Sequence, residues 1–393
     1  MFECRLEPWE KLPENFDTLA PLIQKICFPL LPENPEVGQC YRIYPQNCFS
    51  GNGTAYHGNV RIGRNPKKLL VFLNGGGVSF DEYTAARPNN AFTLHIPDTY
   101  YSNDGEWIGD YFLREGMNAQ REDNPFLDWS IIHILYCNGD FHCGDGEFPY
   151  TAQDGSRRMM HYHGYRNAMA VISAAKQLLP DPDQLLIAGS SAGGFGASLL
   201  ADDIIQQFPS CDHITCCVDS ALILSDRWRD IAANVWRSPS HIAERLTGNN
   251  LVLDNLTALH VKYGDRVKIL FTSSVRDAML TAVENALQGN GQKAEEKDGI
   301  RYQENLKQMC ADLISAIPHV GLYIFTAPMD APGWDETLTL HCGLNNYYLF
   351  EAHEETPSVC EWLLHAVEED RLDRIGLSLL DMEQKRGNWH VFI

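Results

Sequence analysis

The sequence has no hydrophobic run long enough to cross a lipid bilayer. Its longest apolar stretches, such as residues 131–136, reach only the length of a buried β-strand, whereas a membrane-spanning helix needs roughly 20 apolar residues. The first residues carry acidic side chains and prolines where a secretory signal would need an apolar run. The sequence therefore predicts no membrane span and favours a cytoplasmic location, or a secreted one if a leader has been removed.

Positive charge is also scarce. The 393 residues include 31 Lys and Arg against 52 Asp and Glu, which gives a formal net charge of −21. No run of Lys or Arg offsets this charge, so the sequence argues against nucleic acid and anionic membranes as partners. A polyanionic substrate would be repelled at long range unless its site carries local positive charge.

The twelve cysteines lack the paired CxxC pattern of a structural zinc site. Dense disulfide frameworks are typical of much shorter secreted chains, so we expect mostly reduced, buried thiols. Hydrophobic residues make up 44% of the chain and charged residues 21%, which is ordinary for a globular protein with a sizeable core.

Apolar segments of strand length alternate with helical patterns along the chain. Strands are expected near residues 68–73, 129–136, 184–188, 214–218, 267–271 and 321–325, and helices near 165–179, 195–208 and 301–317. This alternation predicts an α/β fold of the α/β-hydrolase type, with a mostly parallel central sheet flanked by helices.

The remaining segments read as additions to one domain spanning residues 1–393. Residues 1–60 lack sustained periodicity and are expected to form a wrapping N-terminal segment. Residues 81–125 are too long for an ordinary connection, so they are expected to form a functional loop or to contain short helices. Residues 359–393 are expected to form a helical tail.

Residues 189–193 (GSSAG) fit the pattern G-x-S-x-G between a predicted strand and a predicted helix. In that position the pattern makes a sharp turn that exposes the central serine, and glycines two residues away on each side allow close packing. Only Ser191 has glycine at both of these positions, so it is preferred over Ser190. The pattern predicts a nucleophilic Ser191; a turn without chemical significance is the alternative.

Glycines also follow the first strong strand, as Asn74-Gly75-Gly76-Gly77. In hydrolases of this fold class, the loop after that strand and the residue after the nucleophile supply the N–H groups of the oxyanion hole. The expected donors are the backbone amides of Gly76, Gly77 and Ala192. A simple glycine turn is the alternative.

The acid and base of such a site follow the serine in the order acid, then histidine. Asp277 lies just beyond a predicted strand and is preferred over Asp219, although either could instead cap the next helix. His341 follows the last strand and is preferred over His353. Together with Ser191 these residues predict acyl transfer that needs no metal or organic cofactor.

The chain resembles the pectin acetylesterase and Notum family over roughly residues 68–345. The segments that carry the resemblance are NPFLDW (124–129), YCNGDFHCGD (136–145), HYHG (161–164), GSSAGG (189–194) and VDS (218–220). The resemblance implies a serine carboxylic ester hydrolase with nucleophile Ser191, acid Asp277 and base His341. It places the oxyanion donors on Gly76, Gly77 and Ala192.

The chain departs from the family in two places near the expected site. The family usually has an aromatic residue where Gly77 stands, and the stretch 326–337 before His341 is longer than usual. In the YC…GD block, Asp140 and Asp145 are expected to orient loops, with substrate contact as the alternative.

The resemblance implies removal of acetyl or other short acyl groups from a glycan-like substrate. A long-chain lipid or protein deacylase, and a non-catalytic binding protein on the same scaffold, are the alternatives. The sequence does not indicate an oligomeric state.

Overall fold

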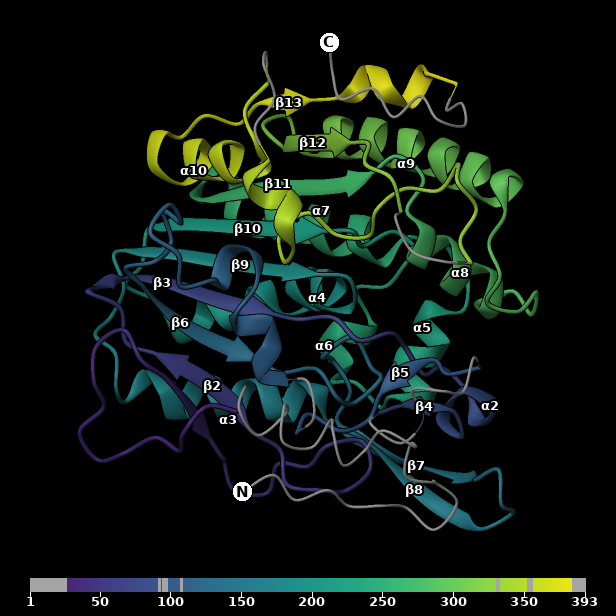
Figure 1. Cartoon of the computed structure of the whole chain (residues 1–393), viewed down its shortest axis with the longest axis horizontal. Helices are drawn as coiled ribbons and strands as arrows, with labels where there is room; N and C mark the ends of the chain where they lie inside the picture. Colours follow the sequence, from purple (N-terminus) through teal and green to yellow (C-terminus); the bar gives the residue numbers. More distant parts are fainter. Residues whose placement is uncertain are drawn as a thin grey trace.

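A nine-stranded sheet forms the centre of the molecule (Figure 1). The computed structural model describes residues 27–90, 93, 98–106, 109–329, 333–351 and 356–383. In spatial order the strands are β1 (Cys40–Ile43), β2 (Gly58–Arg61), β6 (Trp129–Ile134), β3 (Asn65–Leu73), β9 (Gln184–Ser190), β10 (His213–Asp219), β11 (Val267–Ser274), β12 (Gly321–Phe325) and β13 (Arg374–Ile375).

In this spatial order, all neighbouring strands from β6 onward pair in parallel. Strand β2 is antiparallel to both of its neighbours, β1 and β6. The predicted mostly parallel sheet is therefore confirmed. The edge strand β1 and its neighbour β2 come from residues 40–61, where the irregular sequence pattern did not predict them. Residues 1–26 of the predicted N-terminal segment lie outside the described residues.

Side chains alternate between the two faces of the sheet, as they must in extended strands. On β3, Leu69 and Val71 belong to the larger hydrophobic cluster, whereas Leu70 and Phe72 belong to the cluster on the opposite face. Both faces are buried, which explains the continuous apolar runs of the central strands.

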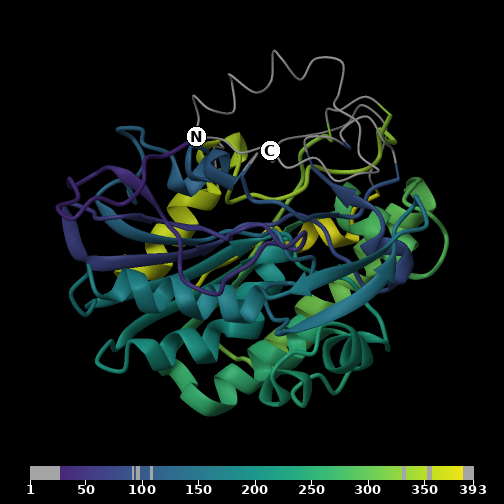
Figure 2. The same cartoon turned by 90° about the horizontal axis from the view of Figure 1, so that it is seen from below.

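Helices cover both faces (Figure 2). The larger cluster includes side chains of four helices, α3 (Gly164–Lys176), α4 (Ala192–Gln207), α7 (Leu251–Tyr263) and α9 (Glu296–Ala316). The opposite cluster includes α10 (Val359–Glu369) and the short 3-10 helices η1 (Gly109–Leu113), η2 (Gly116–Asn118) and η5 (Tyr347–Phe350). The stretch predicted as a helical tail contains α10, the strand β13 and η6 (Leu377–Asp381); residues 384–393 lie outside the described part.

Insertions surround the sheet at several points. The stretch 81–125 contains α2 (Glu82–Ala85), β4 (Pro88–Asn89), β5 (Tyr101–Ser102), η1 and η2. A hairpin of β7 (Gly146–Thr151) and β8 (Arg157–Tyr162) precedes α3. The connection between β10 and β11 contains five helical elements, namely α5 (Trp228–Asp230), the π-helix η3 (Ile231–Val235), α6 (Ser240–Ala243), α7 and η4 (Gly264–Arg266). Helix α8 (Ala278–Leu287) follows β11.

The ten buried cysteines form no disulfide within the described part of the chain. Within the described residues, no helix is both long enough and apolar enough to cross a membrane. Because β9, β10 and β11 are adjacent and parallel, their carboxyl ends lie side by side at one end of the strands, on the right in Figure 1. Most of the residues predicted to be functional lie at this carboxyl end of the sheet.

Candidate active site

Ser191 lies in the turn between β9 and α4 with φ 58° and ψ −129°. An L-residue rarely adopts this conformation, and holding it costs about 1–3 kcal/mol. The turn is fixed because the Ser191 N–H donates to the Asp219 carbonyl at 2.9 Å and the Ser191 carbonyl accepts from the Gly194 N–H at 2.8 Å. A Cβ atom on Gly189 or Gly193 would overlap the neighbouring backbone, which explains the glycine two residues away on each side.

His341 lies against Asp277. Its Nδ1 atom is 2.9 Å and 2.8 Å from the two carboxylate oxygens of Asp277. Asp277 is fully buried and also caps α8, since its Oδ1 accepts the Leu280 N–H at 3.0 Å. Asp277 thus caps α8 and contacts His341 at the same time. The longer stretch 326–337 does not move His341 away from Asp277.

A short backbone bridge brings these two residues together. The Ala278 N–H donates to the Thr339 carbonyl at 3.1 Å, and the Thr339 N–H donates to the Arg276 carbonyl at 2.9 Å. The segment that carries His341 therefore runs along the segment that carries Asp277.

Burial alone would lower the pKa of His341. The negative charge of Asp277, its hydrogen bond to the ring and the charge of Asp219 outweigh burial and raise the pKa above its ordinary value. The imidazolium form is thus stabilised, which suits a group that must accept a proton during a reaction.

Asp219, the alternative acid, forms its hydrogen bonds with the backbone after His341 and not with the His341 ring. Its buried carboxylate accepts the N–H groups of Gly343 and Leu344 at 3.0 Å. Burial raises its pKa, and these backbone donors oppose the rise. Asp219 thus holds the loop that follows His341, whereas Asp277 contacts the ring. His353 lies outside the described residues.

The glycine loop after β3 lies directly against Ser191. A Cβ atom on Gly75 would lie 2.5 Å from the Ser191 Cβ. Gly77 has φ 79°, and a Cβ atom there would overlap the Tyr100 carbonyl, so the aromatic side chain usual in the family does not fit this backbone. No hydrogen bond among the described residues uses the N–H of Gly76, Gly77 or Ala192. These three amides are available to an incoming acceptor.

Asn74 fixes the start of this loop. Its side-chain oxygen accepts the Tyr136 N–H at 3.1 Å and the His133 Nε2–H at 2.9 Å, and its backbone carbonyl accepts the His142 Nε2–H at 2.9 Å. The Tyr136 hydroxyl donates to the Gly77 carbonyl at 2.8 Å. The YC…GD block therefore holds the glycine loop, and sequence reasoning missed the roles of Asn74, Tyr136 and His142 although it found the block.

The two aspartates of that block have separate positions. Asp140 is fully buried and accepts the backbone N–H groups of His142 at 3.1 Å and Gly164 at 2.8 Å. Burial raises its pKa to about 7 despite these donors. Asp145 pairs with Arg166 at 2.8 Å on the surface. Both observations agree with the expected loop-orienting role.

A cavity of about 750 Å³ opens beside Ser191 and His341. The glycine loop and residues 99–102 form one wall. Apolar side chains line another part, namely Phe112, Met279, Ala282, Val283 and Trp334, and Lys293 adds a positive charge. The cavity joins a serine, a histidine–carboxylate pair and unpaired amides, which is the arrangement that acyl transfer requires.

The parallel sheet, the serine turn after β9 and the histidine after the last long strand define an α/β-hydrolase fold. Residues 44–237 match the family model described as pectinacetylesterase. Over this segment the chain is similar to the pectin acetylesterase and Notum family, as its sequence motifs predicted.

Individual relatives agree with this assignment. Pectin acetylesterase 11 of Arabidopsis thaliana is 24% identical over 45% of this chain and 42% of its own length. The palmitoleoyl-protein carboxylesterase NOTUM of Homo sapiens is 24% identical over 41% of this chain and 30% of its own length. The matched region thus spans less than half of each curated relative.

A solved structure supports the fold over a longer range. The Wnt deacylase Notum from Drosophila has a TM-score of 0.54 and 17% identity, with 85% of this chain and 95% of that chain covered.

Proposed function

We propose that this chain is a serine carboxylic ester hydrolase with nucleophile Ser191, base His341 and acid Asp277. The observation that carries the proposal is the His341–Asp277 pair beside the strained Ser191 in one cavity. Similarity to the family supports the same chemistry, since the relatives are named as esterases of pectin and of a palmitoleoylated protein.

The reaction has two half-steps. His341 Nε2 takes the Ser191 proton while Oγ attacks the ester carbonyl carbon, and the N–H groups of Gly76, Gly77 and Ala192 bind the resulting oxyanion. The ester C–O bond then breaks, and the leaving alcohol takes the proton from His341. Water repeats the sequence on the acyl-enzyme, which releases the carboxylic acid and restores Ser191.

The proposed substrate is a glycan-like alcohol carrying acetyl or another short acyl group. Similarity to the pectinacetylesterase family model and the polar loop residues Asn345 and Asn346 at the cavity support this class. The second candidate is a long-chain acyl ester of a lipid or protein, which the apolar wall of Phe112, Met279 and Val283 favours. The same catalytic residues serve either substrate.

A series of chromogenic esters with increasing acyl length tests both parts. Wild type should hydrolyse the esters, Ser191→Ala should lose the activity, and Ser198→Ala, in the helix that follows Ser191, should keep it. A kcat/KM maximum at acetyl supports the short-acyl substrate, whereas a maximum at eight or more carbons supports the second candidate. If Ser191→Ala retains the wild-type rate, the proposed mechanism is wrong.

A further inference from the structure

A second group of chemistry-bearing side chains lies at the base of the β7–β8 hairpin, at the lower right in Figure 1. Glu147 on β7 and His161 on β8 are directly opposite each other in the antiparallel pair. His163 follows two residues later and is the N-cap residue of α3. These residues do not line the cavity beside Ser191.

The three side chains are close enough to share one ligand. One potential ligand atom from each lies within 4.8 Å of the others, and His161 Nδ1 is 3.5 Å from Glu147 Oε1. The two imidazole rings lie 5.2 Å apart at 70° to each other. Donor atoms around a tetrahedral zinc ion are roughly 3.4 Å apart. Glu147 is half exposed, so its side chain can adjust its position toward the two imidazoles.

The Nδ1 atom of His163 is buried and has no hydrogen-bond partner within the described residues, and His163 is only 2% exposed. The Nδ1 atom of His161 is also buried, and Glu147 Oε1 at 3.5 Å is too distant for a normal hydrogen bond. The other ring nitrogen of His161 faces Gly53, where a Cβ atom would lie 3.2 Å from Nε2. A buried polar atom without a partner is unusual in a native protein and calls for one.

Arg166 is three residues beyond His163 and already pairs with Asp145 at 2.8 Å, which reduces its repulsion of a bound ion.

We propose that Glu147, His161 and His163 bind a divalent transition-metal ion of the Zn²⁺ class, with water as the fourth ligand. Two imidazole nitrogens and one carboxylate oxygen form a ligand set that Zn²⁺ accepts, whereas Mg²⁺ and Ca²⁺ prefer oxygen alone. The carboxylate at the solvent edge gives the ion a path in, and the buried imidazoles hold it inside.

The ion would connect three parts of the molecule. It joins β7 to β8 and both strands to the start of α3. Tyr162 lies between the two histidines, and its hydroxyl is 2.7 Å from the Ser79 hydroxyl, two residues beyond Gly77. The bound ion therefore stabilises the side of the molecule that supports the glycine loop.

Titration of the chelator-treated full chain with Co²⁺ and Zn²⁺ tests the proposal. We expect one equivalent of Co²⁺ with the d–d absorption of a four-coordinate site and no thiolate charge-transfer band, displaced by Zn²⁺, and a rise in Tm on Zn²⁺ addition. Glu147→Gln and His161→Gln should each weaken binding at least roughly tenfold. His241→Gln, an exposed histidine that pairs with Asp203, should leave it unchanged.

His163→Gln tests the third ligand. If this variant of a buried residue fails to fold, the variants of the partly exposed Glu147 and His161 still test the proposal. The proposal is wrong if the wild-type chain shows no saturable binding. It is equally wrong if binding survives both Glu147→Gln and His161→Gln, or if a thiolate band shows that cysteines hold the metal.

Discussion

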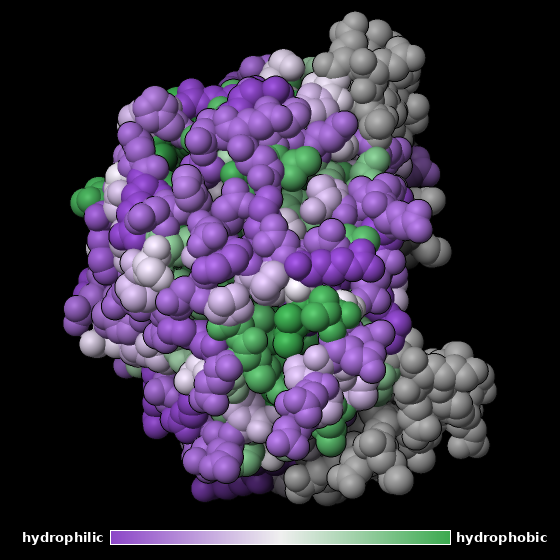
Figure 3. Space-filling view, turned by 90° about the vertical axis from the view of Figure 1, so that its left-hand side faces the viewer, coloured by the Kyte–Doolittle hydropathy of each residue, from purple (hydrophilic) through white to green (hydrophobic). Residues whose placement is uncertain are grey.

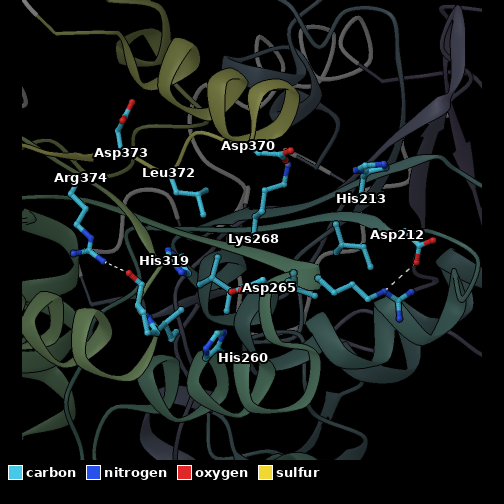
Figure 4. A pocket seen from close by; sticks show the side chains of 16 residues that line it. Asp212, His213, His260, Asp265, Lys268, His319, Asp370, Leu372, Asp373 and Arg374 are labelled. Atoms are coloured by element: carbon cyan, nitrogen blue, oxygen red, sulfur yellow. Dashed lines mark hydrogen bonds and ion pairs between the residues drawn. The ribbon is translucent and has the colours of Figure 1, made fainter.

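Two cavities of similar size lie at opposite ends of the same sheet. The cavity beside Ser191 has a volume of about 750 Å³ and lies at the carboxyl ends of β9 and β11. The other, of about 800 Å³, lies at the amino ends of β10 and β11 (Figure 4). Figure 3 shows the left-hand side of Figure 1, where the amino ends of the parallel strands lie. This surface is largely hydrophilic, with one larger hydrophobic area below the centre and several small ones.

The two cavities differ in how their polar groups are used. At the amino end, Lys268 lies 2.6 Å from Asp370, Arg266 lies 3.5 Å from Asp212, and Arg374 donates to the Pro318 carbonyl at 2.6 Å. At the carboxyl end, the amides of the glycine loop have no partner within the described residues. Unused donors beside a strained serine, rather than volume, therefore distinguish the candidate active site.

The largest contrast is expected between a histidine of each cavity. His341→Ala should lower kcat on the order of 10⁴-fold or more, because the general base is lost. His319→Ala at the amino-end cavity should leave kcat within about twofold, as is usual for a surface change away from the site. Steady-state kinetics on one ester measures both, and equal losses would remove the distinction between the cavities.

Asp277→Asn should lower kcat about 10³- to 10⁴-fold, since the imidazole loses its orienting carboxylate. The wild-type rate should fall as the pH drops through the raised pKa of His341, because only the neutral imidazole takes the proton. Without the Asp277 charge that pKa decreases, so the acid limb of kcat/KM should move to lower pH. Asp265→Asn at the amino-end cavity should leave the pH profile in place; an unchanged profile in Asp277→Asn would contradict the assignment.

Gly77→Ala should lower kcat roughly 10²-fold, the usual loss for one oxyanion donor. The added Cβ would overlap the Tyr100 carbonyl at a backbone φ of 79°, so the loop must shift away from Ser191. The control is Gly289→Ala, which shares a positive φ but has no atom within 4 Å of the added Cβ. If both variants lose stability equally and neither loses activity per folded molecule, Gly77 does not form the oxyanion hole.

The smallest effect is expected at Lys268. Lys268→Ala removes its bonds to Asp370 and to the Ala366 carbonyl at the end of α10, which should lower the free energy of unfolding by about 1 kcal/mol. Its kcat should remain that of wild type. Urea unfolding with parallel kinetics checks this, and a kcat change above tenfold would assign the amino-end cavity a functional role.

Strand positions in the centre of the sheet were predictable because apolar runs of strand length are rare elsewhere. Residues 321–325 form β12 as predicted, but β9, β10 and β11 extend further toward their carboxyl ends. The extensions contain Ser190, Asp219 and Ser274, polar residues whose pairing depends on neighbouring strands and not on local pattern.

The candidate site was predictable only in part. The glycine spacing around Ser191 reports a local turn, so one sequence suffices to find it. Two roles depend on contacts between residues more than 50 positions apart. Asp219 holds the loop after His341 through the Gly343 N–H, and Asn74 fixes the glycine loop through the Tyr136 N–H. No local pattern carries that information, and the hairpin β7–β8 was missed because its first strand contains a proline that weakens the strand signal.

Fluorophosphonate labelling followed by peptide mass spectrometry tests the central claim most directly, since the reagent marks a serine activated by a neighbouring base. The account predicts one equivalent of adduct on Ser191, abolished in His341→Ala and retained in His319→Ala. Stoichiometric adduct on another residue, or adduct on Ser191 that His341→Ala leaves unchanged, would contradict it.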